Sequence, residues 1–224
     1  MPMLIEPRLL PARAGGVKRR VPPLENGDRL TSAEFLRRWE AQPDLKKVEL
    51  IDGQVHMSPP LRADAHSEPD GLIHGWLFHY ATCTPGVKFY PNPTLLLDAD
   101  NTPQPDSVLC TAPRRGHRVW LNARGYLCGQ PELICEVAAS SASIDLHDKL
   151  HAYRRHGIPE YLVWVVGERR ICWFTLVEER YVEMKERSGI LVSRIFPKLA
   201  LDVKALLKLD GARVLATLQR HLAK

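Results

Sequence analysis

Two acidic residues of this sequence, far apart in the chain, could bind one metal ion together. Glu136 interrupts the apolar segment 133–138, which is otherwise hydrophobic, as in a strand covered on both faces. A buried carboxylate without a partner is costly, so Glu136 needs a cation or strong hydrogen bonds. Asp106 directly follows Pro105 at the expected start of another strand. Proline is tolerated at that position because its missing N–H is not needed before the hydrogen bonds between the strands begin. On neighbouring strands, the two carboxylates could hold a hard divalent ion.

A lysine in the following segment could bring a positive charge to the same place. Asp145, Lys149 and Tyr153 recur at every fourth position, which puts them on one face of a helix. That face can point towards the end of the preceding strand, where Glu136 lies. A lysine ammonium beside a metal-bound water can orient the water and, where partly desolvated, accept its proton. These residues therefore predict a hydrolytic site.

Each of these residues also has an ordinary structural explanation. Asp106 could cap a turn after the proline, and an arginine elsewhere could neutralise Glu136. Asp145 and Lys149 could form an ion pair on a helix surface, which contributes about 0.3 kcal/mol. Tyr153 is typical of a packing residue. From the residues alone, both interpretations stay open.

Other kinds of chemistry have little support in the sequence. The five cysteines are odd in number and include no C-x-x-C pair, which argues against a disulfide framework and a zinc cluster. His66, at the start of an apolar helix, is more typical of a structural histidine than of a ligand. No Gly-rich phosphate loop and no G-x-S-x-G motif is present, which disfavours P-loop nucleotide hydrolysis and serine esterase chemistry.

Hydrophobic spacing predicts the elements that must position these residues. Residues 31–34 have capping-box spacing and predict a short helix that ends near Pro43. Asp52-Gly53 predicts the turn of a hairpin. Further along the chain, the pattern predicts a helix over 66–82 and strands over 87–90, 94–97, 107–110, 132–138, 161–166, 171–177 and 190–195.

The remaining segments complete a predicted α/β fold. A helix is expected from a Ser143 cap to about Arg155, and a C-terminal helix from about Val203. Residues 113–130 are rich in Arg and Gly and predict a loop or an excursion at the sheet edge. The order of helices and strands predicts an α+β arrangement with a central mixed sheet flanked by helices.

Length and composition are typical of one globular domain. The chain has 224 residues, of which 45% are hydrophobic and 25% charged. It has no run of about 18 apolar residues, and prolines and arginines interrupt residues 1–16, so neither a spanning helix nor a secretory signal is predicted. We therefore expect a cytoplasmic protein. Residues 1–27 predict a basic, flexible arm, and residues 28–224 a single domain.

The net charge of +5 is unevenly distributed. Residues 1–20 and 208–224 are both basic, so the residues between them carry a small net negative charge. Composition alone therefore does not predict a basic face for nucleic acid. Four arginines within eleven positions could still form such a patch: Arg114, Arg115, Arg118 and Arg124.

The order and spacing of several motifs resemble those of a known nuclease family. The motifs are 48–55 (VELIDGQV), 57–60 (MSPP) followed by His66, 105–108 (PDSV), 131–138 (PELICEVA), and then Ser140, Asp145, Lys149, Tyr153, Gly157, Glu160 and Tyr161. Over residues 28–205 they resemble the PD-(D/E)xK nuclease superfamily and, within it, the Uma-type family of restriction endonucleases common in bacteria.

The resemblance implies a restriction-endonuclease-like core and a metal site. Asp106 and Glu136 are expected to bind Mg²⁺ or Mn²⁺, with the backbone carbonyl of Val137 as a further ligand. Glu49 resembles the additional acidic residue that many members place near the metal.

The usual lysine of the superfamily pattern is missing from its ordinary position. It normally stands two residues after the second acid, but residue 138 is alanine. The resemblance places the lysine on the next helix, at Lys149, where it would orient the attacking water. The implied activity is that of a Mg²⁺-dependent endonuclease, which hydrolyses phosphodiester bonds, with DNA as the expected substrate.

Two other functions stay open at this point. One is a non-catalytic nuclease-like scaffold that binds nucleic acid or a protein partner, although a pure binding module has no use for an unpaired, buried Glu136. The other is a nuclease that acts on RNA. We expect double-stranded DNA as the partner, no membrane and, because many double-strand cutters pair two sites about a twofold axis, a homodimer.

Overall fold

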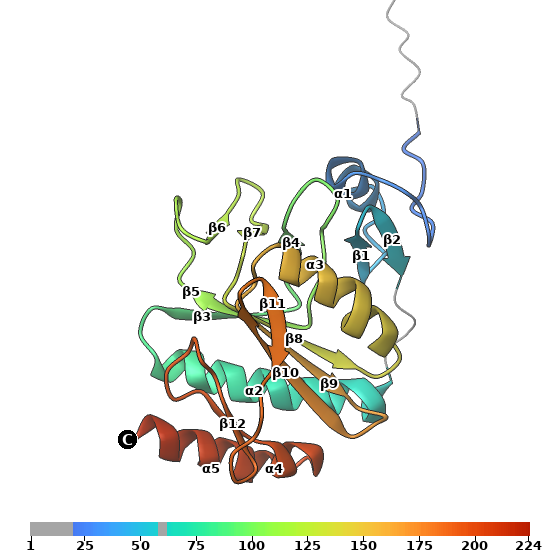
Figure 1. Cartoon of the computed structure of the whole chain (residues 1–224). Coiled ribbons are helices and arrows are strands. Elements are labelled where there is room, and N and C mark those ends of the chain that lie inside the picture. The colour runs from blue at the N-terminus through green and yellow to red at the C-terminus, as the bar shows by residue number, and fades with distance from the viewer. Residues whose placement is uncertain (1–19, 58–61) are drawn as a thin grey trace, which may run out of the picture.

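The computed structural model describes residues 20–57 and 62–224 and contains a six-stranded sheet (Figure 1). The strand order is β11-β10-β9-β8-β5-β3, and β8 and β9 are parallel whereas all other neighbours are antiparallel. The mixed sheet of the predicted fold is thus confirmed. Its strands are β3 (Val87–Pro91), β5 (Ser107–Thr111), β8 (Leu133–Ala138), β9 (Glu160–Val165), β10 (Arg170–Val177) and β11 (Arg180–Glu183).

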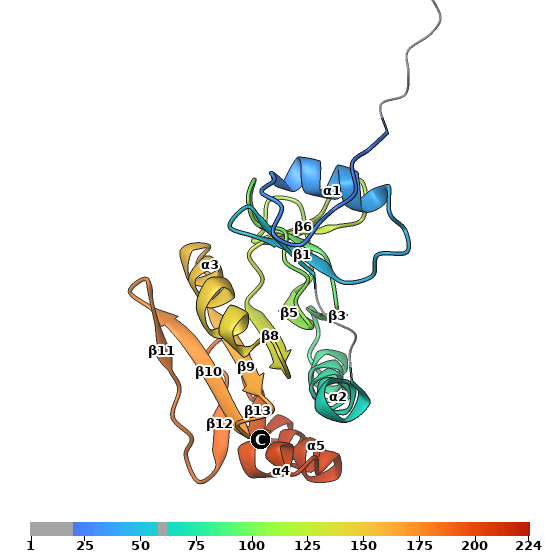
Figure 2. The same ribbon diagram turned by 90° about the vertical axis from the view of Figure 1, so that its right-hand side faces the viewer.

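Helices cover both faces of this sheet (Figure 2). On one face lie α2 (Glu68–Cys83), α4 (Val203–Leu207) and α5 (Gly211–Leu222), and on the other lie η2 (Ile144–Lys149) and α3 (Leu150–Arg155). The segment with η2 and α3 connects β8 to β9, because two parallel strands need a crossover between them.

The alternation of side chains along β8 decides which face each residue meets. Leu133, Cys135 and Val137 pack in the core on the α2 and α5 side. Ile134 and Ala138 pack in the core on the α3 side. Successive residues of a strand point to opposite faces, so Glu136 shares the α3 side with Ile134 and Ala138.

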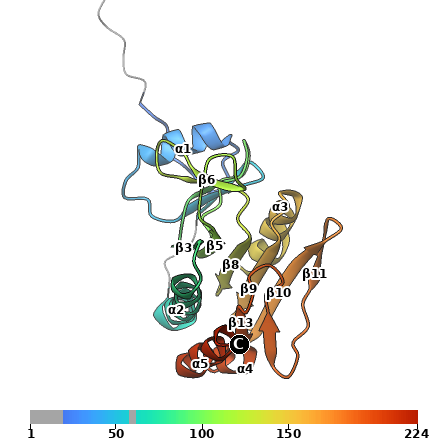
Figure 3. The same ribbon diagram turned by 90° about the vertical axis from the view of Figure 1, so that its left-hand side faces the viewer.

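A third core lies beyond the sheet edge, under helix α1 (Ser32–Glu40) and the hairpin β1 (Val48–Ile51) and β2 (Gln54–Met57) (Figure 3). The hydroxyl of Thr31 accepts the N–H of Glu34 at 3.4 Å, which confirms the predicted cap. Asp52 and Gly53 form the hairpin turn with φ of 49° and 73°, in the left-handed region that this turn requires.

Only the end of the predicted basic arm can be described. Residues 1–19 lie outside the described residues, as do Ser58, Pro59 and Pro60 of the family motif. In residues 20–27, Leu24 is buried in the third core, and the N–H of Gly27 donates to the carbonyl of Val55 at 2.8 Å.

Residues 113–130, predicted as a loop or an excursion at the sheet edge, contain two strands, so the prediction of a loop is wrong. β6 (Val119–Leu121) and β7 (Leu127–Gly129) form a three-stranded sheet with β4 (Leu95–Leu96). The strands have little apolar periodicity and β4 lies remote in sequence, which hides them from local patterns. Gly129 is required there, because its φ is 95° and a Cβ would lie 2.0 Å from the carbonyl oxygen of Arg118.

Several element ends also differ from the predictions. Ser143 lies within the helical turn and makes no capping hydrogen bond. The C-terminal helix is two helices, because the carboxylate of Asp210 caps a new one by accepting the N–H of Arg213. The last predicted strand ends early, as β12 (Ile190–Val192), which pairs with β13 (Ala200–Asp202).

No helix within the described part of the chain combines the length and the apolar character needed to cross a membrane.

Candidate active site

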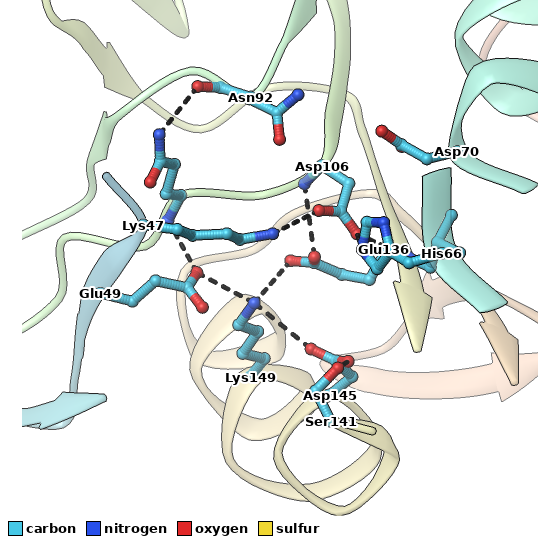
Figure 4. A network of polar contacts seen from close by, with 12 residues as sticks. Lys47, Glu49, His66, Asp70, Asn92, Asp106, Glu136, Ser141, Asp145 and Lys149 are labelled. Carbon is cyan, nitrogen blue, oxygen red and sulfur yellow. Dashed lines mark hydrogen bonds and ion pairs between the residues drawn. The ribbon is translucent and has the colours of Figure 1, made fainter. Parts of the chain in front are cut away.

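Asp106 and Glu136 face each other across two neighbouring strands. Ser107 of β5 pairs with Cys135 of β8, and continuing this antiparallel register by one residue puts Asp106 opposite Glu136. The backbone N–H of Asp106 donates to Oε2 of Glu136 at 3.3 Å (Figure 4). Both side chains are buried. The two carboxylates therefore meet in space, as the sequence predicted.

Strand β1 brings a third carboxylate to the same place. Val48 and Leu50 point into the third core, so the alternating positions Lys47 and Glu49 point the other way. Oε1 of Glu49 accepts the backbone N–H of Gln104 at 2.8 Å, which fixes its direction. Glu49 is buried beside the other two acids (Figure 4).

Lys149 links the carboxylates of this site. Its Nζ lies 2.9 Å from Oε1 of Glu49, 3.0 Å from Oε1 of Glu136 and 3.3 Å from Oδ1 of Asp145. Asp145 in turn accepts the hydroxyl of Ser141 at 2.5 Å. The Asp145–Lys149 pair is thus buried in the site and is not a surface ion pair.

The local shape of η2 helps to aim Asp145 and Lys149. This segment is a π-helix, in which hydrogen bonds span five residues. Turns of this kind are rare in proteins, and those that occur are often found at functional sites. The buried Tyr153 follows in α3 and donates its hydroxyl to Oε1 of Glu136 at 3.2 Å. Tyr153 also packs against Tyr161, with ring centroids 4.9 Å apart, so it is both a packing residue and a partner of the site.

Two residues of the site were absent from the predicted set. Nζ of Lys47 lies 2.5 Å from Oδ1 of Asp106. Nε2 of His66 lies 3.5 Å from Oδ2 of Asp106, and Nδ1 of His66 has no hydrogen-bond partner among the described residues. Lys47 could have been found, because it stands two residues before Glu49 and shares its side of the strand. His66 belongs to the family motif that follows residues 57–60, but the direction of its side chain depends on the π-helix η1 (Ala63–Ser67).

Asp106 is held in its ionised form by its neighbours. Burial alone would raise its pKa. Three groups lower the pKa and together outweigh burial: the hydrogen bond from His66, the ammonium of Lys47, and the N–H of Val137, which donates to Oδ2 at 2.8 Å. The pKa of Asp106 is therefore below its ordinary value. Burial also lowers the pKa of Lys47, but the charges of Asp106 and Glu136 outweigh it, so this pKa is raised.

Glu136 is in the opposite situation. Burial raises the pKa of Glu136, and the charge of Lys149 lowers it. The negative charges of Asp145 and Asp106 raise it further, so the pKa of Glu136 is well above its ordinary value. Four buried carboxylates, those of Glu49, Asp106, Glu136 and Asp145, share the site with two ammonium groups. When all are ionised, two negative charges are left without an ammonium partner.

The model of the Uma2 family, described as "Putative restriction endonuclease", matches residues 32–204. The chain belongs to this family. The matched range includes Glu49, Asp106, Glu136 and Asp145, and the resemblance seen in the sequence is confirmed. No curated protein matches this Uma2 chain.

A solved structure supports the same fold. It is a crystal structure described as a putative nuclease belonging to DUF820 from Anabaena variabilis ATCC 29413. The likeness has a TM-score of 0.62 with 14% sequence identity, and covers 80% of this chain and 98% of the other. The restriction-endonuclease-like fold of the Uma2 chain is therefore confirmed, and the family supports a nuclease.

The donor atoms at the site suit a hard divalent ion. In residues 20–57 and 62–224, no group of three or more His, Cys, Asp or Glu side chains could hold a metal ion by itself. Mg²⁺, however, commonly binds through one or two carboxylates and keeps several waters. The two carboxylates of Asp106 and Glu136 therefore match the number and type of protein ligands that Mg²⁺ needs. The carbonyl of Val137, predicted as a further ligand, accepts the N–H of Ala139 at 3.2 Å. Its role as a ligand stays a prediction.

Proposed function

We propose that this Uma2 chain is an endonuclease that hydrolyses phosphodiester bonds in DNA with the help of Mg²⁺ or Mn²⁺. The observation that carries the proposal is the convergence of Asp106 and Glu136, buried and opposite each other, in a site with more carboxylates than ammonium groups. Buried charge of this kind is costly unless a cation compensates it. A divalent ion would supply positive charge beside these carboxylates.

The residues would divide the work as follows. Asp106 and Glu136 would hold the ion, and Glu49 would support the site through Lys149. When bound, the ion would offset negative charge that develops on the phosphate in the transition state. The backbone N–H of Val137 would hold Asp106 in its ionised form, ready to act as a ligand.

Lys149 is the proposed group that orients the attacking water. Its ammonium has three N–H bonds and three carboxylate neighbours, so contact with a water requires the exchange of one neighbour. Asp145 lies at the longest distance, 3.3 Å, and Ser141 can continue to hold it. We therefore expect the contact with Asp145 to give way.

Cleavage of supercoiled plasmid DNA with Mg²⁺ or Mn²⁺ tests the proposal. The wild-type protein is expected to cut, and Asp106→Asn is expected to be inactive, because an amide replaces one of the two carboxylate ligands. Direct conversion to linear plasmid would support a homodimer with paired sites, and an RNA substrate run in parallel tests the alternative target. Equal cutting by wild type and Asp106→Asn, or no cutting of either nucleic acid, would count against the assignment.

The segment 107–131, which contains the antiparallel pair β6 and β7 and is called the arginine-rich hairpin below, supports nucleic acid as the substrate. Residues 107–131 contain four arginines and no aspartate or glutamate. Arg118 donates to the carbonyl of Gly157 at 2.9 Å, and Arg124 pairs with Glu40 at 2.9 Å. Arg114 and Arg115 are exposed and make no side-chain hydrogen bond or ion pair with the described residues.

The same hairpin offers a surface for a nucleobase. The side chains of Arg115, His117 and Trp120 line a surface hollow of about 550 Å³, and Trp120 is 40% exposed. Exposed aromatic rings beside arginines are typical of surfaces that stack bases and contact phosphates. The hairpin is therefore the surface that we propose for contact with DNA.

Salt titration of DNA binding by the inactive Asp106→Asn protein measures this contact. Adding Arg114→Ser and Arg115→Ser is expected to reduce the slope of log K against log salt concentration by about 2, because two phosphate contacts are lost. Lys204→Ser with Lys208→Ser is a matched control, because it removes the same charge from exposed positions around α4, far from the hairpin in all three views (Figures 1 to 3). Equal slopes for both double variants would contradict the role of the hairpin.

A further inference from the structure

The two lysines of the site are held in different ways. Lys149 contacts three carboxylates, and its side chain is only 3% exposed. Lys47 contacts one carboxylate, that of Asp106, and its side chain is 20% exposed. Removing the ammonium of Lys149 from the site would leave three buried carboxylates behind, whereas Lys47 can turn towards solvent and leave only one.

The contact of Lys47 is on the oxygen that a metal ion would use. Oδ2 of Asp106 accepts the N–H of Val137 at 2.8 Å and lies 3.5 Å from Nε2 of His66. Oδ1 has one partner among the described residues, the ammonium of Lys47 at 2.5 Å. Figure 4 shows this ammonium beside Asp106 and on the same side as Glu136. An ammonium and a divalent ion carry the same sign of charge, so both cannot favourably occupy this position.

We propose that the ammonium of Lys47 takes the place of the divalent ion on Asp106 when the ion is absent, and that binding of the ion displaces it. This inference rests on the proposed function and names a residue that tunes it. Lys47 keeps Asp106 paired in the metal-free protein, so that the site stays folded without the ion. It also competes with the ion and thereby sets the metal concentration at which the site fills.

Calorimetric titration with Mn²⁺ tests the displacement without any measurement of cleavage. Lys47→Met removes the competing charge and is expected to bind Mn²⁺ about tenfold more tightly than wild type. Lys46→Met is the matched control, because Lys46 is the neighbouring lysine, is exposed and has no contact with the site. Its Mn²⁺ affinity is expected to equal that of wild type.

A second variant keeps the test decisive if Lys47→Met does not fold, which its far-UV circular dichroism would reveal. Lys47→Arg keeps the charge and can pair with a carboxylate through two parallel hydrogen bonds, so it is expected to bind Mn²⁺ more weakly than wild type. A Mn²⁺ affinity for Lys47→Met equal to or below that of wild type would overturn the inference, and so would an unchanged affinity for Lys47→Arg.

Asp106→Asn separates failure of this inference from failure of the proposed function. If wild type binds Mn²⁺ and Asp106→Asn does not, the metal site stands, and the two Lys47 variants decide the inference alone. If Asp106→Asn binds as wild type does, or if wild type does not bind Mn²⁺, the proposed metal site fails and the role of Lys47 fails with it.

Discussion

Replacing Glu136 with glutamine is expected to slow DNA cleavage by about a thousandfold or more without lowering the stability of the metal-free protein. The loss of rate follows because a bound ion contributes several kcal/mol of charge stabilisation in the transition state, and Glu136 is one of its two proposed side-chain ligands. The amide oxygen of glutamine can still accept the hydrogen bonds from Lys149 and Tyr153, and the hydrogen bond that is lost is the long one of 3.3 Å from the N–H of Asp106.

Stability is expected to be preserved because the fold already disfavours the ionised form of Glu136. Burial and the charges of Asp145 and Asp106 raise the pKa of this residue well above its ordinary value, so a neutral side chain removes an electrostatic cost. Initial rates of plasmid cleavage and thermal unfolding without metal measure the two effects.

Glu132→Gln is the matched control for this change. Glu132 directly precedes β8 and is also buried, but it accepts the N–H and the hydroxyl of Thr111 at 3.1 and 3.0 Å, away from the site. Its variant is expected to cleave at the wild-type rate. Cleavage by Glu136→Gln within tenfold of wild type would end the assignment of Glu136 as a ligand.

Replacing Lys149 with methionine is expected to lower the free energy of unfolding by about 3–5 kcal/mol. Breaking a buried ion pair by removing one partner costs this much because it leaves an uncompensated buried charge. Here the partners of the lost ammonium are three carboxylates, those of Glu49, Glu136 and Asp145. Burial lowers the pKa of Lys149, but these three charges outweigh it, so the pKa is well above its ordinary value and the ammonium is charged at neutral pH.

Urea unfolding followed by circular dichroism measures this loss. The control is Lys88→Met, because Lys88 lies exposed on β3 and its replacement is expected to change the stability by less than about 0.5 kcal/mol. A loss of stability below about 1 kcal/mol for Lys149→Met would contradict the prediction, because it would mean that the ammonium of Lys149 does not stabilise the three buried carboxylates. Adding Glu136→Gln to Lys149→Met is expected to recover part of the loss, because one buried negative charge is removed.

The two variants also distinguish two kinds of contribution to the site. Glu136→Gln is expected to lose cleavage and keep stability, which is the behaviour of a ligand. Lys149→Met is expected to lose both, because its ammonium orients chemistry and also holds the carboxylates together. The contacts of Lys149 with three buried carboxylates are the reason for this difference.

The sequence by itself determined those features that depend on neighbouring residues. The cap at Thr31 and the turn at Asp52-Gly53 follow from the local chemistry of the backbone, so both could be predicted. Glu136 could be recognised as exceptional because a carboxylate in an apolar strand must have a partner. The order of the family motifs then indicated that Asp106 and Lys149 are candidates for that partnership.

The tertiary structure alone decided how these groups meet. The pairing of β5 with β8 puts Asp106 opposite Glu136, and such a register depends on the packing of both faces of the sheet. The same holds for the strands within 113–130, whose partner β4 is remote in sequence. Lys47 and His66 reach Asp106 because β1 and η1 converge on the start of β5. Contacts between segments so far apart arise from the fold as a whole, because a local pattern fixes only the side of a strand on which a residue such as Lys47 lies.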